Sequence, residues 1–143
     1  MATQVQVVFD CGNPGRMASF WSEVLGYQVQ PPPDGYGSWE EFLRSVGVPE
    51  SEWDSASAIV DPADTGPRIY FQKVPERKVV KNRVHLDINV GGRDTPTEER
   101  RKRVDAEAER LSGLGATRIR SCDQQGEYWV AMLDPEGNEF DIQ

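Results

Sequence analysis

The chain has 143 residues, which is enough for one domain with a real core and too short for two large independent domains. Its formal net charge of -8 argues against a general binder of nucleic acid or anionic membrane, because such binders need basic surface. Cys11 and Cys122 are too few for a disulfide framework, and the sequence shows neither an apolar run of membrane-spanning length nor a secretory signal. We therefore expect a cytoplasmic protein that contacts neither nucleic acid nor membrane.

The first helix is marked at both ends. Asn13 can cap it, Pro14 can occupy its first turn, and Gly26 can supply the C-terminal stop. Large apolar side chains recur between these ends at helical spacing: Met17, Phe20, Trp21, Val24 and Leu25. This pattern predicts a helix with one apolar face that covers a sheet.

An insertion follows the first helix. Residues 31–55 contain three successive prolines, a Gly-Tyr-Gly turn and a predicted short helix from about Trp39 to Val46. The rings of Trp39, Phe42 and Trp53 need a packing partner in this otherwise polar stretch. Two roles stay open: a lid over a ligand cavity, or padding of an outer wall or dimer contact.

The predicted strands divide into an apolar and a polar face, and the alternation is complete over residues 84–90. The apolar sets are Val5, Val7 and Phe9; Ile69 and Phe71; Val84, Leu86, Ile88 and Val90; and Phe140 and Ile142. The opposite sets are Gln6, Val8 and Asp10; Arg68, Tyr70 and Gln72; Arg83, His85, Asp87 and Asn89; and Glu139, Asp141 and Gln143. If the apolar faces meet the helices, the polar faces of all four strands point the same way.

Two interpretations of these polar faces remain open. In a one-sided antiparallel sheet they face solvent. In a sheet that curls they line a cavity, and Gln6, Gln72, His85 and Asp141 then converge from four strands. A histidine that meets oxygen ligands in this way is a donor set for a divalent metal.

The second helix is predicted to begin after Thr95 as cap, with Pro96 next and Glu98 at the capping-box position. Gly115 is the expected stop. The apolar stripe consists of Val104, Ala108, Leu111 and Leu114.

The sequence is also repeated. A Leu-Gly pair at 25–26 recurs at 114–115, and Ala-Ile-Val-Asp-Pro at 58–62 recurs as Ala-Met-Leu-Asp-Pro at 131–135. Each copy reads as strand, helix and three strands, so the repeat predicts two βαβββ modules that share one domain and can hold a small ligand. The expected modules are residues 3–75 and 80–143, to within a few residues.

Two charged residues near His85 bear on its chemistry. Asp87 lies two residues further on the same face, where a carboxylate can orient the imidazole for proton transfer without a metal. Arg83 can hold an anionic substrate group in a guanidinium fork. The simpler interpretation, which the sequence favours, is an ion pair of Arg83 with Asp10 or Asp87.

Segments 14–27 (PGRMASFWSEVLGY), 81–90 (KNRVHLDINV) and 133–142 (LDPEGNEFDI) resemble the glyoxalase, bleomycin-resistance and extradiol-dioxygenase superfamily, also called vicinal oxygen chelate proteins. The resemblance is to its glyoxalase-like branch and spans nearly the whole chain. It implies an α+β fold of two βαβββ modules, which form a cupped mixed sheet around a cavity and carry their helices on the outer face. It also implies metal-ligand positions on the first and last strands of each module: Gln6, Gln72, His85 and Asp141.

This donor set is weak for a metal. It offers one imidazole, one carboxylate and two neutral amides, whereas firm sites for zinc or nickel use more histidine or carboxylate. Asp141 is also one methylene shorter than the glutamate that the family uses there. The sequence therefore favours a site without a metal, in which His85 is hydrogen-bonded inside the sheet to Asp87 or Asp141, over one that holds zinc, nickel, manganese or iron.

Two functions stay open. The first is a glyoxalase-like lyase or isomerase that acts on a small polar organic molecule, with His85, Asp87 and Asp141 as catalytic residues. The alternative is a non-catalytic protein of the bleomycin-resistance type, which binds or sequesters its ligand. The resemblance also implies a homodimer. Expected ligand contacts are Gln6, Asp10, Trp39, Trp53, Tyr70, Arg83 and Trp129.

Overall fold

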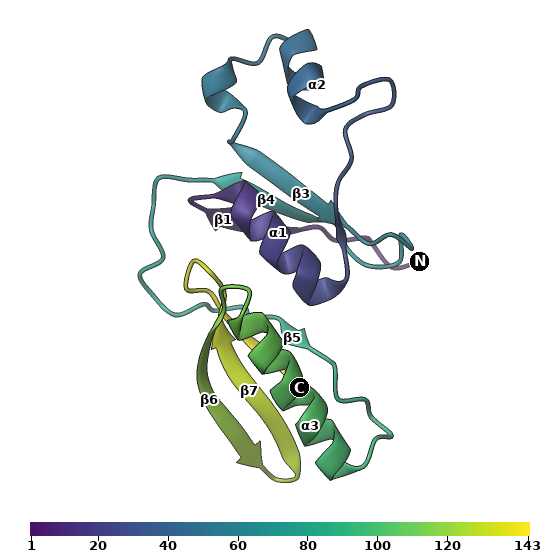
Figure 1. Ribbon diagram of the computed structural model, residues 1–143, viewed down its shortest axis with the longest axis vertical. Helices are drawn as coiled ribbons and strands as arrows, with labels where there is room; N and C mark the ends of the chain where they lie inside the picture. Colours follow the sequence, from purple (N-terminus) through teal and green to yellow (C-terminus); the bar gives the residue numbers. More distant parts are fainter. The chain divides into compact units, whose positions relative to one another are not determined.

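The computed structural model describes residues 1–143 (Figure 1). Its internal contacts divide the chain into two compact units, Met1–Arg77 and Lys78–Gln143. None of the helices has both the length and the apolar character that a membrane span requires.

The first unit is a four-stranded mixed sheet with one long helix. Its strands lie in the order β1-β4-β3-β2, in which β1 and β4 are parallel and the other pairs antiparallel. The elements are β1 (Val7–Cys11), α1 (Pro14–Leu25), β2 (Gln28–Val29), α2 (Trp39–Ser45), a short 3-10 helix η1 (Glu50–Glu52), β3 (Ala56–Val60) and β4 (Ile69–Lys73). The strand expected from Val5 begins at Val7, and the Val5 side chain is exposed.

The end signals of α1 are confirmed. The Asn13 side chain accepts a hydrogen bond from the Arg16 N–H at 3.1 Å, and Gly26 ends the helix with a φ of 67°, in the left-handed region that glycine tolerates. The apolar face of α1 packs on β3 and β4, where Trp21 is buried. Phe9 of β1 contacts Trp21 and Phe71 edge to face, with ring centroids 5.2 and 5.4 Å apart.

The insertion contains the predicted short helix, α2, which lies beyond one end of β3 (Figure 1). Its rings find partners close by. Phe42 contacts Trp39 at a centroid distance of 5.8 Å, and Trp39 Nε1 donates a hydrogen bond of 2.7 Å to the Gln30 carbonyl. Trp53 Nε1 donates to the Val48 carbonyl at 3.0 Å. The aromatic residues therefore stabilise the insertion itself.

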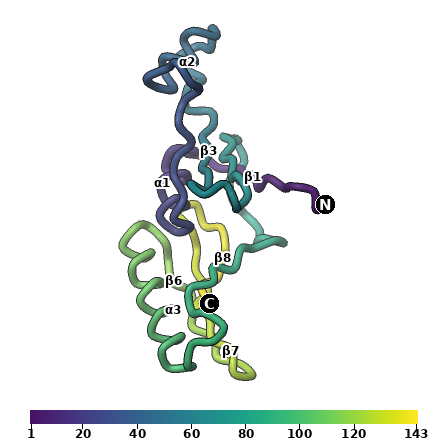
Figure 2. The backbone as a smooth tube through the Cα atoms, turned by 90° about the vertical axis from the view of Figure 1, so that its right-hand side faces the viewer, coloured from purple at the N-terminus to yellow at the C-terminus, as the bar shows by residue number.

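The second unit repeats the topology of the first. Its order, β5-β8-β7-β6, again places the first strand parallel to the last and the third strand next to it. The elements are β5 (Asp87–Ile88), α3 (Thr97–Ser112), β6 (Thr117–Gln124), β7 (Glu127–Leu133) and β8 (Glu139–Ile142). Figures 1 and 2 show α3 along one face of this sheet. The expected α+β class with two βαβββ modules is confirmed.

The strand expected over residues 84–90 is wrong in its extent. Only Asp87 and Ile88 pair in the ladder, and the Val84 side chain is 82% exposed. Upstream of Leu86, whose carbonyl accepts from the Asp141 N–H at 3.0 Å, the chain leaves the ladder, and the Asn82 N–H donates to the Glu139 carboxylate at 2.9 Å.

Both ends of α3 also differ from expectation. The helix begins at Thr97 without a side-chain cap, and the Thr95 hydroxyl instead accepts from Arg103 Nη1 at 3.4 Å. It ends at Ser112, so Leu114 lies beyond the last turn and is 44% exposed. The buried stripe is Val104, Ala108 and Leu111.

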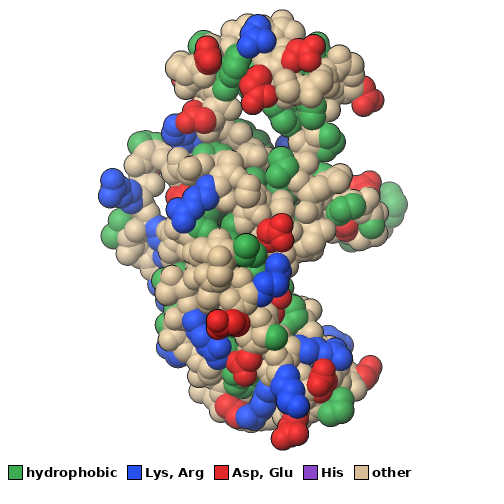
Figure 3. All heavy atoms as spheres, in the orientation of Figure 1, with side chains coloured by type: hydrophobic (Ala, Val, Ile, Leu, Met, Phe, Trp, Pro, Cys, Tyr) green, Lys and Arg blue, Asp and Glu red, His purple; other side chains and the backbone are tan.

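The charged run on α3 forms ion pairs within the helix and with strand β7. Arg103 pairs with Glu99 at 3.3 Å, and Arg100 pairs with Glu127 at 3.5 Å. Figure 3 shows acidic and basic side chains intermixed on this part of the surface. The run is a solvated helix face, as its mixed signs predict.

Candidate functional site

The candidate site lies on the face of the second sheet that α3 leaves open. Val130 and Ile142 are buried on the α3 side, so their neighbours in sequence point the other way. The register aligns Asp87 of β5, Asp141 of β8 and Ala131 of β7 in one row across three strands.

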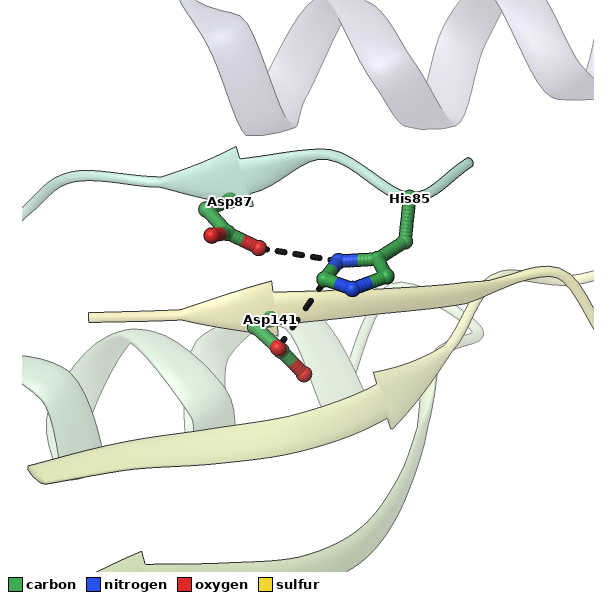
Figure 4. Close-up of side chains that lie close together, drawn as sticks. All are labelled: His85, Asp87 and Asp141. Carbon is green, nitrogen blue, oxygen red and sulfur yellow. Dashed lines mark hydrogen bonds and ion pairs between the residues drawn. The ribbon is translucent and has the colours of Figure 1, made fainter. Parts of the chain in front are cut away.

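His85 joins this row from the segment just before β5. Its Nδ1 lies 3.0 Å from Asp87 Oδ1 and 3.8 Å from Asp141 Oδ2 (Figure 4). One donor atom from each of the three residues lies within 4.8 Å of the others. The side chains of His85 and Asp87 are 41% and 42% exposed and that of Asp141 is 23% exposed, so a small molecule can reach the group.

The two carboxylates influence each other. Burial, and secondly the Asp87 charge, raise the pKa of Asp141 above its ordinary value, while His85, Lys81 and Arg120 act in the opposite direction. The ionised form of Asp141 is therefore disfavoured, and a proton or a cation shared with its neighbours would stabilise this side chain.

An open hollow next to this group is lined by Val80, Lys81, Asn82, Arg83 and His85. Arg83 thus lies beside the candidate site, and no ion pair joins it to Asp87. The pairing that the sequence favoured for Arg83 within this unit is wrong: Asp87 Oδ1 lies instead at 3.0 Å from the His85 imidazole.

The residues present fit a divalent metal better than the expected set did. One imidazole and two carboxylates supply anionic oxygen together with nitrogen, which suits manganese, iron or zinc better than amide oxygens do. Of the four expected ligands, His85 and Asp141 belong to this cluster. Asp87 is the donor that sequence reasoning missed as a ligand, although its shared face with His85 was the available signal.

Gln6 of the first unit is engaged elsewhere. Its Oε1 accepts a hydrogen bond of 2.8 Å from Arg68 Nη1. A guanidinium at this oxygen opposes a metal cation there, so Gln6 is a poor ligand as it stands. Sequence reasoning did not single out Arg68, although its place on the polar face with Tyr70 was visible.

The strand registers correct the fourth ligand position. Ala58 and Ala131 occupy the same place in the repeated Ala-x-x-Asp-Pro motif; Ala58 pairs with Tyr70, and Ala131 pairs with Asp141. Tyr70 is therefore the residue equivalent to Asp141. Gln72, which was expected there, lies two residues further along β4 and pairs with Asp10 of β1.

The remaining expected contacts are distributed over both units. Trp129 lies two residues before Ala131 on β7, so it shares the open face with Asp141. Asp10 is exposed on the polar face of the first sheet. Trp39 and Trp53 are half-buried within the insertion. The structure thus brings His85, Asp87, Asp141 and, more loosely, Arg83 together in one unit.

Comparison with known proteins agrees with this fold. The family model described as "Glyoxalase-like domain" matches residues 6–143, whereas no curated protein matches. A glyoxalase/bleomycin resistance protein/dioxygenase family enzyme from Burkholderia phytofirmans is 19% identical, with a TM-score of 0.63 over 99% of this chain and 97% of that chain.

The fosfomycin resistance protein FosX from Listeria monocytogenes is 11% identical, with a TM-score of 0.66 over 100% of this chain and 93% of that chain. A mutant of this FosX, 13% identical, was solved with Mn(II) and 1S,2S-dihydroxypropylphosphonic acid; its TM-score is 0.62, over 100% of this chain and 90% of that chain. At these identities the likeness concerns the fold. Because the family model covers nearly the whole chain, the protein belongs to the glyoxalase-like domain family.

Proposed function

We propose that the chain is a glyoxalase-like lyase or isomerase that acts on a small polar organic molecule, with His85, Asp87 and Asp141 as its reactive group. The observation that most supports this proposal is the convergence of the three side chains, with His85 Nδ1 at 3.0 Å from Asp87 and 3.8 Å from Asp141. The three side chains are also accessible, so a substrate can reach them.

Asp87 prepares the imidazole for proton transfer. When its carboxylate accepts the Nδ1 proton of His85, the Nε2 atom keeps a lone pair and can take a proton from the substrate. The same carboxylate stabilises the imidazolium that forms. Asp87 is thus a positioning residue, and His85 is the residue that moves the proton.

Asp141 lies on β8, beside Asp87 and His85, so the same substrate can contact it. If a divalent metal is bound, His85, Asp87 and Asp141 would hold it, and it would supply Lewis-acid polarisation of substrate oxygens. Arg83, which lines the hollow beside His85, supplies a cation for an anionic substrate group.

The test compares wild type with His85→Ala and with His85→Gln, which keeps most of the side-chain volume. The substrates are fosfomycin and the adducts that 2-oxoaldehydes form with thiols, supplied with and without Mn²⁺. We expect turnover by wild type and a loss of about a hundredfold or more in both variants. Equal turnover by wild type and both variants would refute the role of His85.

The alternative is a sequestering protein of the bleomycin-resistance type. The openness of the group, whose His85 and Asp87 side chains are about two-fifths exposed, favours reversible binding as a second candidate. Binding of a ligand by wild type and by His85→Ala with the same affinity, without turnover by either, would support it. Homodimerisation stays a prediction, which sedimentation velocity checks.

A further inference from the structure

Arg68 forms a second polar centre on the open face of the first sheet. It immediately precedes β4 and shares a face with Tyr70, because the two residues lie two apart in an extended segment. Its guanidinium carbon lies 5.4 Å from the centroid of the Tyr70 ring. The residues that hold it come from segments far away in the sequence.

Two amide oxygens fix the guanidinium. Arg68 Nε donates to Gln30 Oε1 at 2.7 Å, and Nη1 donates to Gln6 Oε1 at 2.8 Å. Gln6 precedes β1 and Gln30 follows β2, so bonds from both sides of β4 hold the side chain. A side chain held in this way loses little further freedom when it binds a ligand.

The charge of Arg68 has no carboxylate partner, although acidic residues outnumber basic ones in this unit. Lys73, on the same strand, pairs with Asp54 at 2.7 Å. In the second unit, Arg110 and Arg118 likewise pair with carboxylates. Arg68 is thus a half-buried, oriented cation that only neutral groups satisfy.

We propose that Arg68 binds the carboxylate, phosphonate or phosphate group of a small organic ligand. The N–H groups that Gln6 and Gln30 leave unused can form the fork that such anions accept. The Tyr70 ring lies beside the guanidinium, and Trp39 donates a hydrogen bond to the backbone carbonyl of Gln30, whose side chain holds Arg68. These rings offer contact to the organic part of the ligand.

The inference goes beyond the proposed function, because it assigns the first unit an anion site of its own. The site itself uses no residue of the His85 group. Anion binding is therefore measurable apart from turnover. In this view Gln6 positions Arg68 and is not a metal ligand.

The test is calorimetric titration of the full chain at constant ionic strength with methylphosphonate, inorganic phosphate, lactate and the neutral analogue lactamide. We expect wild type to bind at least one of the anions and not lactamide. Arg68→Gln should weaken anion binding by about tenfold or more, and Arg68→Lys, which keeps the charge without the fork, should weaken it less. Preference for phosphonate and phosphate over lactate would distinguish phosphoryl-type ligands from carboxylates.

Lys73→Gln is the matched control, because it removes a cation of the same strand that already pairs with Asp54. It should leave anion binding unchanged, and so should His85→Ala. Far-ultraviolet circular dichroism shows whether Arg68→Gln folds. If it does not, the proposal is tested by the weaker anion binding expected of Arg68→Lys and by the preference of wild type for lactate over lactamide.

Equal affinity of wild type and the folded Arg68 variants, or no discrimination of the anions from lactamide, would overturn the proposal. Loss of binding in His85→Ala alone would place the anion at the second unit and also overturn it. Loss of turnover with intact anion binding would instead leave the Arg68 site standing and concern only the proposed function.

Discussion

Asp61 and Asp134 hold corresponding turns in the two halves of the chain. Asp61 follows β3, and its carboxylate accepts hydrogen bonds from the backbone N–H groups of Ala63 at 2.9 Å and Gly66 at 2.9 Å. Asp134 follows β7 and accepts from the backbone N–H groups of Glu136 and Asn138 at 2.9 and 3.0 Å. The Asp-Pro pair of the sequence repeat is thus the turn that leads into the last strand of each module.

We expect Asp134→Ala to destabilise the fold by about 1–3 kcal/mol, because Asp134 is 3% exposed and the N–H groups that it satisfies would lose their partner. Urea unfolding followed by fluorescence measures this difference. Asp134→Asn is the matched control and should cost less, because it keeps one acceptor oxygen. Equal midpoints for Asp134→Ala and wild type would contradict the role of this turn.

Asp61 predicts a pH dependence of stability. Hydrogen bonds from Thr65, Ala63 and Gly66 lower its pKa from 3.8 to about 2. Because the pKa of Asp61 is lower in the folded state, the unfolded chain takes up the proton first as the pH falls. The stabilisation that the ionised Asp61 gives the folded state is therefore present above about pH 4 and is lost as the pH falls toward 2. Asp61→Asn should show a flatter dependence of the unfolding free energy on pH between 4 and 2. An unchanged slope would contradict it.

Local signals account for the parts of the fold that the sequence predicted well. Asn13, Pro14 and Gly26 mark the ends of α1 because caps and stops act within one turn of the helix. The strand prediction at Val84 was wrong where residues far apart along the chain meet. Val84 is exposed, and two residues before it the Asn82 N–H donates to the Glu139 side chain, a partner that no local signal indicates.

The candidate site was predictable to the same degree. Strand alternation places His85, Asp87 and Asp141 on one face, and the structure brings them together there. Strand alternation does not specify which residues a side chain will bond to. Arg68 bonds to Gln30 and Gln6, which lie 38 and 62 positions away in the sequence, and no periodic pattern predicts such partners.

Divalent metal should stabilise the folded protein through the His85 group. If Mn²⁺ or Zn²⁺ binds only the folded form, a concentration of about a hundred times Kd adds about 3 kcal/mol. We expect a rise in Tm for wild type that His85→Ala and Asp141→Ala abolish. Asp87→Ala should also reduce it, because Asp87 contributes the third donor.

The control for this experiment is Gln6→Ala, which tests the ligand position that the family resemblance implies. Gln6 Oε1 accepts a hydrogen bond from Arg68, so Gln6→Ala should leave the metal-induced rise in Tm intact. A shift that persists in His85→Ala, or one that Gln6→Ala abolishes, would contradict the assignment of the metal to His85, Asp87 and Asp141.

Asp141→Asn should stabilise the metal-free protein at neutral pH while it impairs the site. Burial and the neighbouring Asp87 raise the pKa of Asp141, so the folded state binds its proton more tightly than the unfolded state does. The ionised form therefore weakens the fold as the pH rises through the raised pKa, and a neutral amide removes this cost. We expect a gain below about 1 kcal/mol, since the carboxylate is partly solvated. Urea unfolding at pH 7 and pH 4 measures this gain in the free energy of unfolding, which should be smaller at the lower pH. Destabilisation by Asp141→Asn at pH 7 would show instead that the attraction of His85, Lys81 and Arg120 for the carboxylate prevails.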